Sequence, residues 1–159
     1  MSEAAITTAI IAIASVICAG MLVSAIYPAA NRATSSVIAT STKLGERIET
    51  AIDIIAEANE TSHASIWVKN TGSSEIPQIA SSDVFFGGIH TFQRIPYDED
   101  RTPAPCWNYS LDNDDGDGRW DVGETLCVVI NSSTPIAAGD YYVKVIVYNG
   151  ISDEDTFSI

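Results

Sequence analysis

The acidic side chains between residues 113 and 124 stand at the spacing of metal ligands. Oxygen-bearing side chains at alternate positions around a glycine are typical of a twelve-residue calcium loop, because Ca²⁺ takes six to eight hard oxygen ligands at about 2.3 to 2.6 Å. With Gly118 at position 6, the expected ligands are Asn113, Asp115, Asp117, the backbone carbonyl of Arg119, Asp121 and Glu124. The pattern predicts a bound cation, with Ca²⁺ as the expected cofactor.

Two residues depart from the usual calcium loop. Asn113 replaces the first aspartate, and Trp120 occupies a position that is normally aliphatic. No helical pattern flanks the loop on either side, so the similarity is to the loop alone. A solvated acidic hairpin tip is the alternative interpretation.

Catalytic motifs are not found in this sequence. It contains two histidines, His63 and His90, without zinc-ligand spacing, and it has neither a G-x-S-x-G elbow nor a phosphate-binding G-x-x-x-x-G-K loop. The sequence therefore predicts a protein that is not an enzyme.

Three cysteines divide by position. Cys18 lies in an apolar segment, whereas Cys106 and Cys127 flank the acidic loop. A Cys106–Cys127 disulfide would close a loop of about 20 residues and stabilise it by roughly 3 kcal/mol in an oxidising compartment. Two unpaired, half-buried thiols are the alternative.

Three N-glycosylation sequons occur after the apolar segment, at Asn59, Asn108 and Asn131. Together with the expected disulfide, they favour an exterior location for the C-terminal part. The positive-inside rule favours the opposite orientation, because Arg32, Lys43 and Arg47 follow the apolar segment. Glu46 and Glu49 lie among these basic residues, and we therefore expect the exterior orientation.

The N-terminal segment is predicted to be one long helix over residues 1–58. Residues 4–31 carry no charge, and residues 4–28 are long enough to form a single membrane span or the core of a filament. Its Ala, Ser, Thr and Gly side chains would let neighbouring helices approach closely. Residues 29–58 continue as an amphipathic helix, and Pro28 is expected to kink or divide the rod. A membrane anchor followed by an unrelated short helix is the alternative.

The remainder of the chain is strongly acidic. The sequence has 21 Asp and Glu against 8 Lys and Arg, and only Glu3 precedes Arg32, which leaves net charge −12 after the apolar segment. Such a surface repels phosphate backbones, so nucleic acid is excluded as a partner.

Residues 61–159 have the pattern of short strands and turns. Expected strands cover residues 64–69, 83–86, 89–95, 125–130, 140–148 and 155–159. Several short strands separated by turn residues favour an antiparallel sandwich. The predicted class is α+β, a long helix followed by an immunoglobulin-like β-sandwich.

The order of these segments resembles the FlaG-type proteins of the archaeal motility filament, the archaellum. The resemblance lies in ITTAIIAIASVICAGMLVSAIYPA, the helix that continues it, IWVKNTGSSEIP, DVFFG and the terminal YYVKVIVYNGISDEDTFSI. FlaF proteins, archaellins and type IV pilins share this plan of helix plus sandwich. The resemblance covers nearly the whole chain and is strongest at its two ends.

The resemblance implies a stator or basal filament protein that spans the archaeal cytoplasmic membrane once and extends its sandwich to the cell surface. The implied partners are a FlaF-like protein, an archaellin or a surface-layer protein, together with membrane lipid. A homo-oligomer or filament through the N-terminal helix is the alternative, and a membrane-tethered glycan-binding module is a third interpretation.

Two expectations concern the first residues. Pilin precursors carry a basic leader, but no Lys or Arg precedes residue 4, so either a leader was removed or the protein is inserted uncleaved, which Met1 favours. In pilins an early carboxylate can pair with the terminal amine of a neighbouring subunit, an assembly role that Glu3 could have here. A water-exposed acid in the first helical turn is the alternative.

Overall fold

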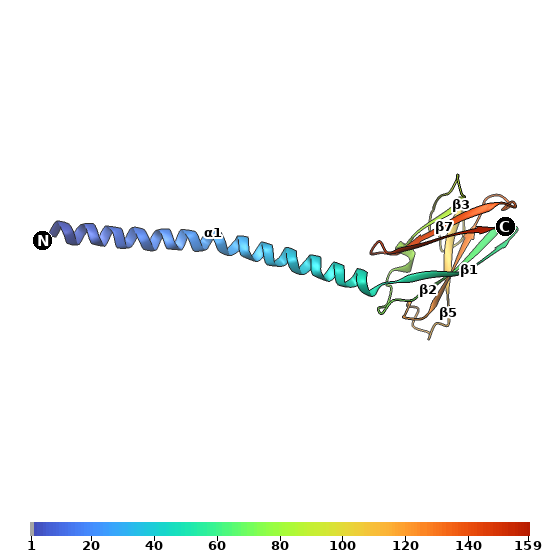
Figure 1. Cartoon of the computed structure of the whole chain (residues 1–159), viewed down its shortest axis with the longest axis horizontal. Helices are drawn as coiled ribbons and strands as arrows, with labels where there is room; N and C mark the ends of the chain where they lie inside the picture. Colours follow the sequence, from blue (N-terminus) through green and yellow to red (C-terminus); the bar gives the residue numbers. More distant parts are fainter. Residues whose placement is uncertain (1) are drawn as a thin grey trace. The chain divides into compact units, whose positions relative to one another are not determined.

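The N-terminal helix is continuous. The structure, a computed structural model, describes residues 2–159, and α1 extends over Ser2–Glu49 (Figure 1). Hydroxyl groups along it donate to carbonyls four residues back, as Thr7 does to Glu3 and Ser36 to Arg32. Pro28 lies inside α1 and removes one backbone donor, but it does not divide the helix.

The predicted helical boundary at residue 58 is wrong. α1 ends at Glu49, and residues 52–60 form the strand β1 (Ile52–Glu60). The apolar residues Ile48, Ala51 and Ile55 are spaced as on a helix, but Ile52, Ile54 and Ile55 are β-branched and favour a strand. Ile52 is buried in the core of the sandwich, and this tertiary packing overrides the helical spacing.

Two antiparallel four-stranded sheets confirm the predicted α+β class and the sandwich. The first sheet has the order β1-β2-β6-β5 and the second has the order β4-β3-β7-β8. Their remaining strands are β2 (His63–Asn70), β3 (Asp83–Gly88), β4 (Gln93–Ile95), β5 (Cys106–Asp112), β6 (Thr125–Asn131), β7 (Asp140–Ile146) and β8 (Ser152–Ser158). A short 3-10 helix, η1 (Ile79–Ser81), precedes β3.

Most strands lie where the sequence predicts them, with three differences. β1 and β5 were not predicted, and the strand expected over residues 89–95 is confined to Gln93–Ile95. Residues 89–92 instead form the turn between β3 and β4, where the Thr91 N–H donates to the Gly88 carbonyl at 2.7 Å.

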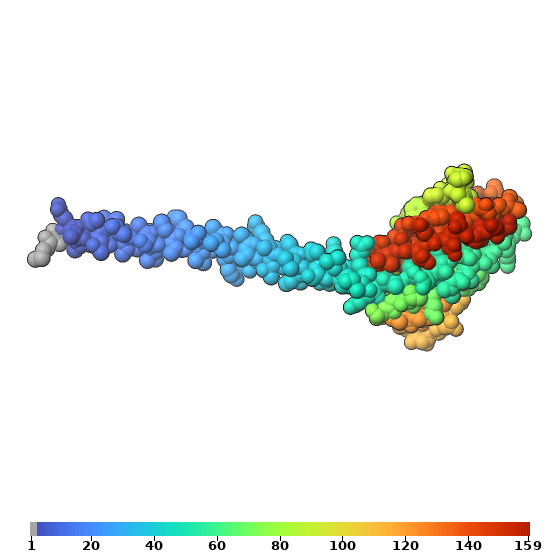
Figure 2. Space-filling view, in the orientation of Figure 1, coloured from blue at the N-terminus to red at the C-terminus, as the bar shows by residue number. Residues whose placement is uncertain are grey.

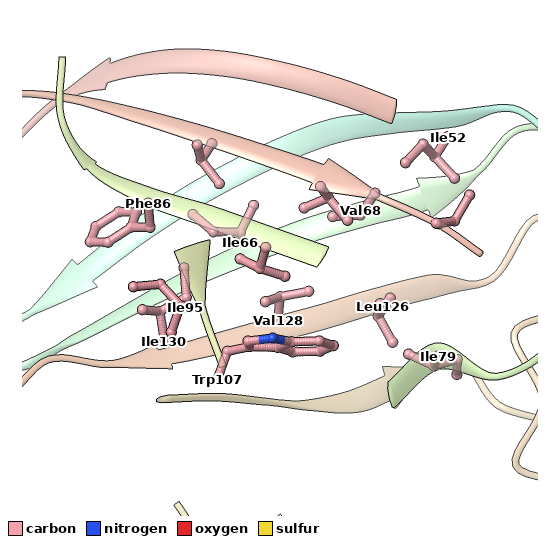
Figure 3. Close-up of a cluster of buried hydrophobic side chains, with 14 of the residues drawn as sticks. Ile52, Ile66, Val68, Ile79, Phe86, Ile95, Trp107, Leu126, Val128 and Ile130 are labelled. Carbon is pink, nitrogen blue, oxygen red and sulfur yellow. The ribbon is translucent and has the colours of Figure 1, made fainter. Parts of the chain in front are cut away.

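The core lies between the two sheets (Figure 3). Alternate side chains of β2 and β6 point inward, so that Ile66, Val68 and Val128 are fully buried. Trp107 and Trp120 are the largest fully buried side chains. The first sheet supplies more of the described core than the second, which contributes β-branched residues and Phe86.

The end of α1 is bonded into the sandwich. The last carbonyls of a helix lack partners within the helix. Here the Glu49 carbonyl accepts from the Ser73 N–H at 2.7 Å, and the Ala51 carbonyl accepts from the N–H groups of Thr71 and Gly72, each at 3.0 Å. By internal contacts the chain forms two compact units that divide between Lys43 and Leu44, so this last part of α1 belongs to the sandwich unit.

Candidate functional site

Residues 4–31 of α1 carry no charge, and their side chains are exposed along the helix (Figure 2). The helix is long and apolar enough to cross a membrane by its length and composition, with a mean hydropathy of 2.6 in its most apolar window. Large apolar side chains such as Val16 and Met21 are 72% and 68% exposed. In water this exposure would be unfavourable by about 25 cal/mol per Å² of apolar surface, so the segment requires lipid or other helices around it.

Glu3 is exposed in the first turn of α1. Its carboxylate lies at the end of the helix where the backbone dipole favours negative charge. Pairing of Glu3 with the amine of a neighbouring subunit stays a prediction.

The acidic loop connects β5 with β6 and is held by a buried tryptophan. Trp120 is fully buried, and its indole Nε1–H donates to the Glu124 carbonyl at 3.2 Å. The Trp120 carbonyl accepts from the Ile76 N–H at 3.0 Å. The second half of the loop is thereby fixed on the sandwich, and Glu124 is only 8% exposed.

The carboxylates of the loop form two overlapping groups. Carboxylate oxygens of Asp115, Asp117 and Asp121 lie within 4.8 Å of one another, and the same holds for Asp114, Asp115 and Glu124. Asp115 belongs to both groups. One ion with metal-to-oxygen distances of about 2.4 Å could therefore contact carboxylates of both groups after side-chain rotations.

Backbone amides of the loop hold its carboxylates. Asp114 accepts from the N–H groups of Gly116 at 3.1 Å and Gly118 at 3.3 Å, and Asp117 accepts from the Arg119 N–H at 2.8 Å. Gly116 and Gly118 have φ of 101° and 73°, in the left-handed region that favours glycine. The loop conformation therefore depends on these two glycines.

The carboxylates of the acidic loop repel one another. Partial desolvation, followed by the negative charges of Asp117 and Glu124, raises the pKa of Asp121 above its ordinary value. The Arg119 side chain turns to Glu75 at 2.7 Å, and this hydrogen bond and ion pair raise the pKa of the guanidinium. The Arg119 Nε also lies 3.7 Å from an Asp117 carboxylate oxygen, so this exposed pair offsets part of the repulsion. A cation among the carboxylates would relieve the rest.

Four of the predicted ligand side chains fall in these two groups: Asp115, Asp117 and Asp121 share one, and Asp115 shares the other with Glu124. The Arg119 side chain lies on Glu75, which agrees with the expected use of its carbonyl only. Sequence analysis missed Asp114, because the second position of a calcium loop is not a ligand position. The dense acidic run from Asp112 to Asp117, interrupted only by Asn113 and Gly116, is the available signal.

The predicted Cys106–Cys127 disulfide is wrong. Both thiols are free, and Cys127 is opposite Ser110, four residues along β5 from Cys106. Four residues of strand span about 13 Å, whereas disulfides need Cα atoms within about 7 Å. Burial raises the pKa of both thiols, and Asp112 adds to the effect at Cys127, so neither is a reactive thiolate.

The three sequons differ in exposure. Asn59 is exposed near the end of β1, where a glycan has room. Asn108 and Asn131 are each 7% exposed, and the Asn108 amide lies against the Arg101 guanidinium. A glycan on either buried asparagine would displace packed strands, so glycosylation stays a prediction for Asn59 alone.

Fold and site together define a class of protein, one in which an apolar helix of membrane length continues into an acidic antiparallel sandwich. The model of the archaeal-type flagellin family matches residues 2–157, and the chain belongs to this family. An uncharacterised protein of Archaeoglobus fulgidus is 29% identical over 167 residues, covering 99% of both chains.

Solved structures show the same fold. The archaellum periplasmic stator protein FlaG of Sulfolobus acidocaldarius is similar with a TM-score of 0.59 and 20% identity, over 68% of this chain and 99% of that chain. The complex of FlaF and FlaG from the same organism gives 0.58 and 19%, over 67% and 87%. The archaeal flagellum of Methanospirillum hungatei strain JF1 gives 0.73 and 12%, over 97% and 92%.

Proposed function

We propose that this protein is a structural component of the archaellum, a stator or basal protein that anchors the motor between the cytoplasmic membrane and the surface layer. One observation carries the proposal: the helix α1 has an exposed, charge-free segment of membrane length and continues directly into a sandwich of the archaellum type. The proposed role is mechanical anchoring, because a rotary motor exerts torque only against a part that is fixed in the envelope.

Residues 4–28 cross the cytoplasmic membrane once in this proposal, and the sandwich lies at the cell surface. A FlaF-like protein is the proposed partner, since the FlaG of Sulfolobus acidocaldarius has been solved as a stator complex with FlaF. An archaellin or a surface-layer protein is the further contact that anchoring requires.

A filament subunit is the second candidate. It is supported by the flagellum of Methanospirillum hungatei, which matches 97% of this chain and therefore includes the helix. In that arrangement the small side chains of residues 4–28 would pack against helices of neighbouring subunits instead of lipid.

Fractionation of cells that express tagged protein from its own locus tests these candidates. A stator remains in the membrane fraction and is scarce in sheared filaments, whereas a subunit is abundant in them. Val16→Lys places a charge at mid-span, where it costs about 3 kcal/mol, and should release the protein from the membrane; Val37→Lys makes the same change outside the span and should not. Full solubility of the unmodified chain without lipid or assembly would contradict both candidates.

We also propose that the acidic loop binds a divalent cation, with Ca²⁺ as the ion. The support is the overlap of the two carboxylate groups and the raised pKa of Asp121. When bound, the ion would neutralise the loop and stiffen it, held by Asp115, Asp117, Asp121 and Glu124.

Calorimetric titration of the full chain in detergent with CaCl₂ tests the cation site. We expect saturable binding that Asp117→Asn and Glu124→Gln weaken at least about tenfold, a loss of about 1.4 kcal/mol. Asp100→Asn removes one exposed carboxylate outside the loop and is the matched control. Absence of calcium-dependent heat, or equal weakening by Asp100→Asn, would contradict the site.

A further inference from the structure

One end of the sandwich contains a cavity that neither the proposed anchoring role nor the acidic loop uses. Its volume is about 220 Å³, and it lies between the ends of β3, β4, β6 and β7. We call it the distal cavity, because it lies at the end of the sandwich away from the junction with α1. Asn131 on the cavity wall pairs with His63, the first residue of β2. Asn70, the last residue of β2, pairs with Ile52, which follows α1 closely.

The floor of the distal cavity is apolar. Phe86, Ile95 and Ile130 belong to the core and lie together at one end of it (Figure 3). Tyr141 also lines the cavity and stacks on Phe86 with ring centroids 5.5 Å apart. A ligand that enters would therefore place C–H groups against this floor.

The rim of the cavity is polar and neutral. Thr91, Gln93 and Thr134 are exposed there, and within the described chain their side-chain hydroxyl and amide groups make no hydrogen bond to protein. Ser133 adds a further hydroxyl of the same kind. These groups supply both donors and acceptors to a ligand.

No residue that lines the distal cavity carries a charge at neutral pH, although the chain has 21 acidic and 8 basic side chains. A second cavity of about 350 Å³ is by contrast bordered by Glu75 and Arg119. The distal cavity therefore selects against charged ligands, because an ion would lose hydration without gaining a partner.

We propose that the distal cavity binds one neutral sugar residue. A pyranose has apolar C–H faces and a belt of hydroxyl groups, which match the apolar floor and the hydroxyl and amide rim. Three of the four strands that line the cavity, β3, β6 and β7, are inner strands of their sheets, so strand addition by a peptide is disfavoured. The volume is below the roughly 300 to 1,000 Å³ of clefts for larger ligands, which limits the occupant to one residue.

Titration of the isotope-labelled full chain with glucose, mannose, galactose and N-acetylglucosamine tests the proposal. The chain is kept in a phosphocholine detergent, because maltoside detergents carry a sugar head group. We expect at least one sugar to bind with a dissociation constant of about 1 to 10 mM and to shift the amide signals of Thr91, Gln93, Ser133 and Thr134. Glucuronate, which adds a charge to the same ring, should bind at least about tenfold more weakly.

Two variants and their control keep the test decisive. Thr134→Asp places a charge on the rim and should weaken sugar binding at least about tenfold, and Thr156→Asp makes the same change on exposed β8 and should leave it unchanged. Gln93→Ala removes one rim amide without adding charge and should weaken binding several-fold.

Methyl glycosides distinguish the two sources of the sugar. Equal binding of a methyl glycoside and the free sugar supports the terminal residue of an envelope glycan, whereas binding of the free sugar alone supports a free monosaccharide. The proposal is overturned if no neutral sugar shifts the rim signals, or if an uncharged Ser/Thr-rich peptide shifts them at lower concentration than any sugar does. Membrane retention of the chain is unaffected by either result, so a failure here is distinct from a failure of the anchoring role.

Discussion

Among the glycines of the sandwich, Gly72 leaves the least room for a Cβ atom, where the segment after β2 meets the end of α1. A Cβ atom at this position would lie 2.5 Å from the Glu49 carbonyl oxygen and 2.7 Å from the Ala51 nitrogen. Both atoms belong to backbone that is already hydrogen-bonded to the same segment, so neither can move freely.

Gly72→Ala should therefore destabilise the sandwich by about 2 kcal/mol or more, since the backbone must shift to admit the methyl group. Unfolding of the full chain in detergent, followed by the near-ultraviolet signal of Trp107 and Trp120, measures this. Gly139→Ala is the matched control, because its Cβ would meet only a Tyr141 ring carbon at 3.9 Å. Equal stability of the two variants would show that the close approach carries no constraint.

Glu57 lies where the edge strands β1 and β8 meet. One of its carboxylate oxygens is buried without a hydrogen-bond partner, and desolvation, followed by the charge of Asp155, raises the pKa of Glu57. The folded state thus binds this proton more tightly than the unfolded state does. Its ionisation lowers the free energy of unfolding at neutral pH, and this loss disappears as the pH falls through the raised pKa toward the ordinary value of 4.5.

Glu57→Gln should raise the midpoint of thermal unfolding at about pH 7, and this gain should be smaller at pH 4.5, because the raised pKa of the wild-type carboxyl group lets it take up a proton as the pH falls. The Gln amide can also donate to Asp155. Glu60→Gln, on the exposed end of the same strand, should change the midpoint little at either pH. A gain for Glu57→Gln that is the same at both pH values would contradict the assignment.

Single residues could be predicted from the sequence only where local spacing determines their role. Four carboxylates of the acidic loop follow from such spacing, because the loop is short and its glycines fix its turns. The disulfide could not be predicted correctly, because it depends on the register of β5 against β6, which neither cysteine encodes. The burial of Asn108 and Asn131 likewise follows only from tertiary packing.

Among the strands and loops, Asn70 joins the acidic loop to the segment that holds the end of α1. It is fully buried, and its amide donates to the carbonyls of Ser74 at 3.0 Å and Trp120 at 3.2 Å. Its side-chain oxygen accepts from the Gly72 N–H at 3.0 Å, and its backbone N–H donates to the Glu124 carbonyl at 2.9 Å. Each polar group of the side chain thus has a partner.

Asn70→Asp should loosen both loops together, because the new carboxylate oxygen would face two carbonyls in a buried position; we expect a loss of about 3 kcal/mol or more. Hydrogen exchange of the Gly72, Ser73 and Gly123 amides measures the effect at both loops. Asn59→Asp is the same change at an exposed position of β1 and should leave these rates unaltered. Faster exchange in one loop only would show that Asn70 does not couple them.

Strand prediction succeeded where β-branched and aromatic residues are bounded by turn residues, as in β3, β6 and β7. It failed at β1, where the spacing of Ile48, Ala51 and Ile55 fits a helix equally well. It failed at β5 because Cys106–Asp112 mixes polar and apolar residues whose burial comes from the neighbouring β6 and from the Tyr97 bridge to Trp107. Local pattern and tertiary packing disagree at both places, and packing prevails.

The chain as a whole combines a helix whose residues 4–31 are uncharged with a strongly acidic sandwich. Hydropathy locates the apolar span, but the compact units divide between Lys43 and Leu44, within α1, where composition changes little. Residues 32–159 carry net charge −12. The ion pairs described among them involve Arg94, Arg119 and Lys144. Most carboxylates therefore face water and one another.

Salt should consequently stabilise the sandwich. Repulsion among excess carboxylates opposes the compact state, and the screening length falls from about 10 Å at 0.1 M to about 3 Å at 1 M salt. We expect the thermal midpoint of the full chain to rise with NaCl over this range and then level off, with choline chloride acting equally because the effect is screening.

Exposed ion pairs such as Arg94–Asp83 weaken under the same conditions, but each contributes at most about 1 kcal/mol and cannot reverse the trend. A midpoint that falls with salt would mean that pairing outweighs repulsion, and a response to NaCl but not to choline would point to bound cations in place of general screening.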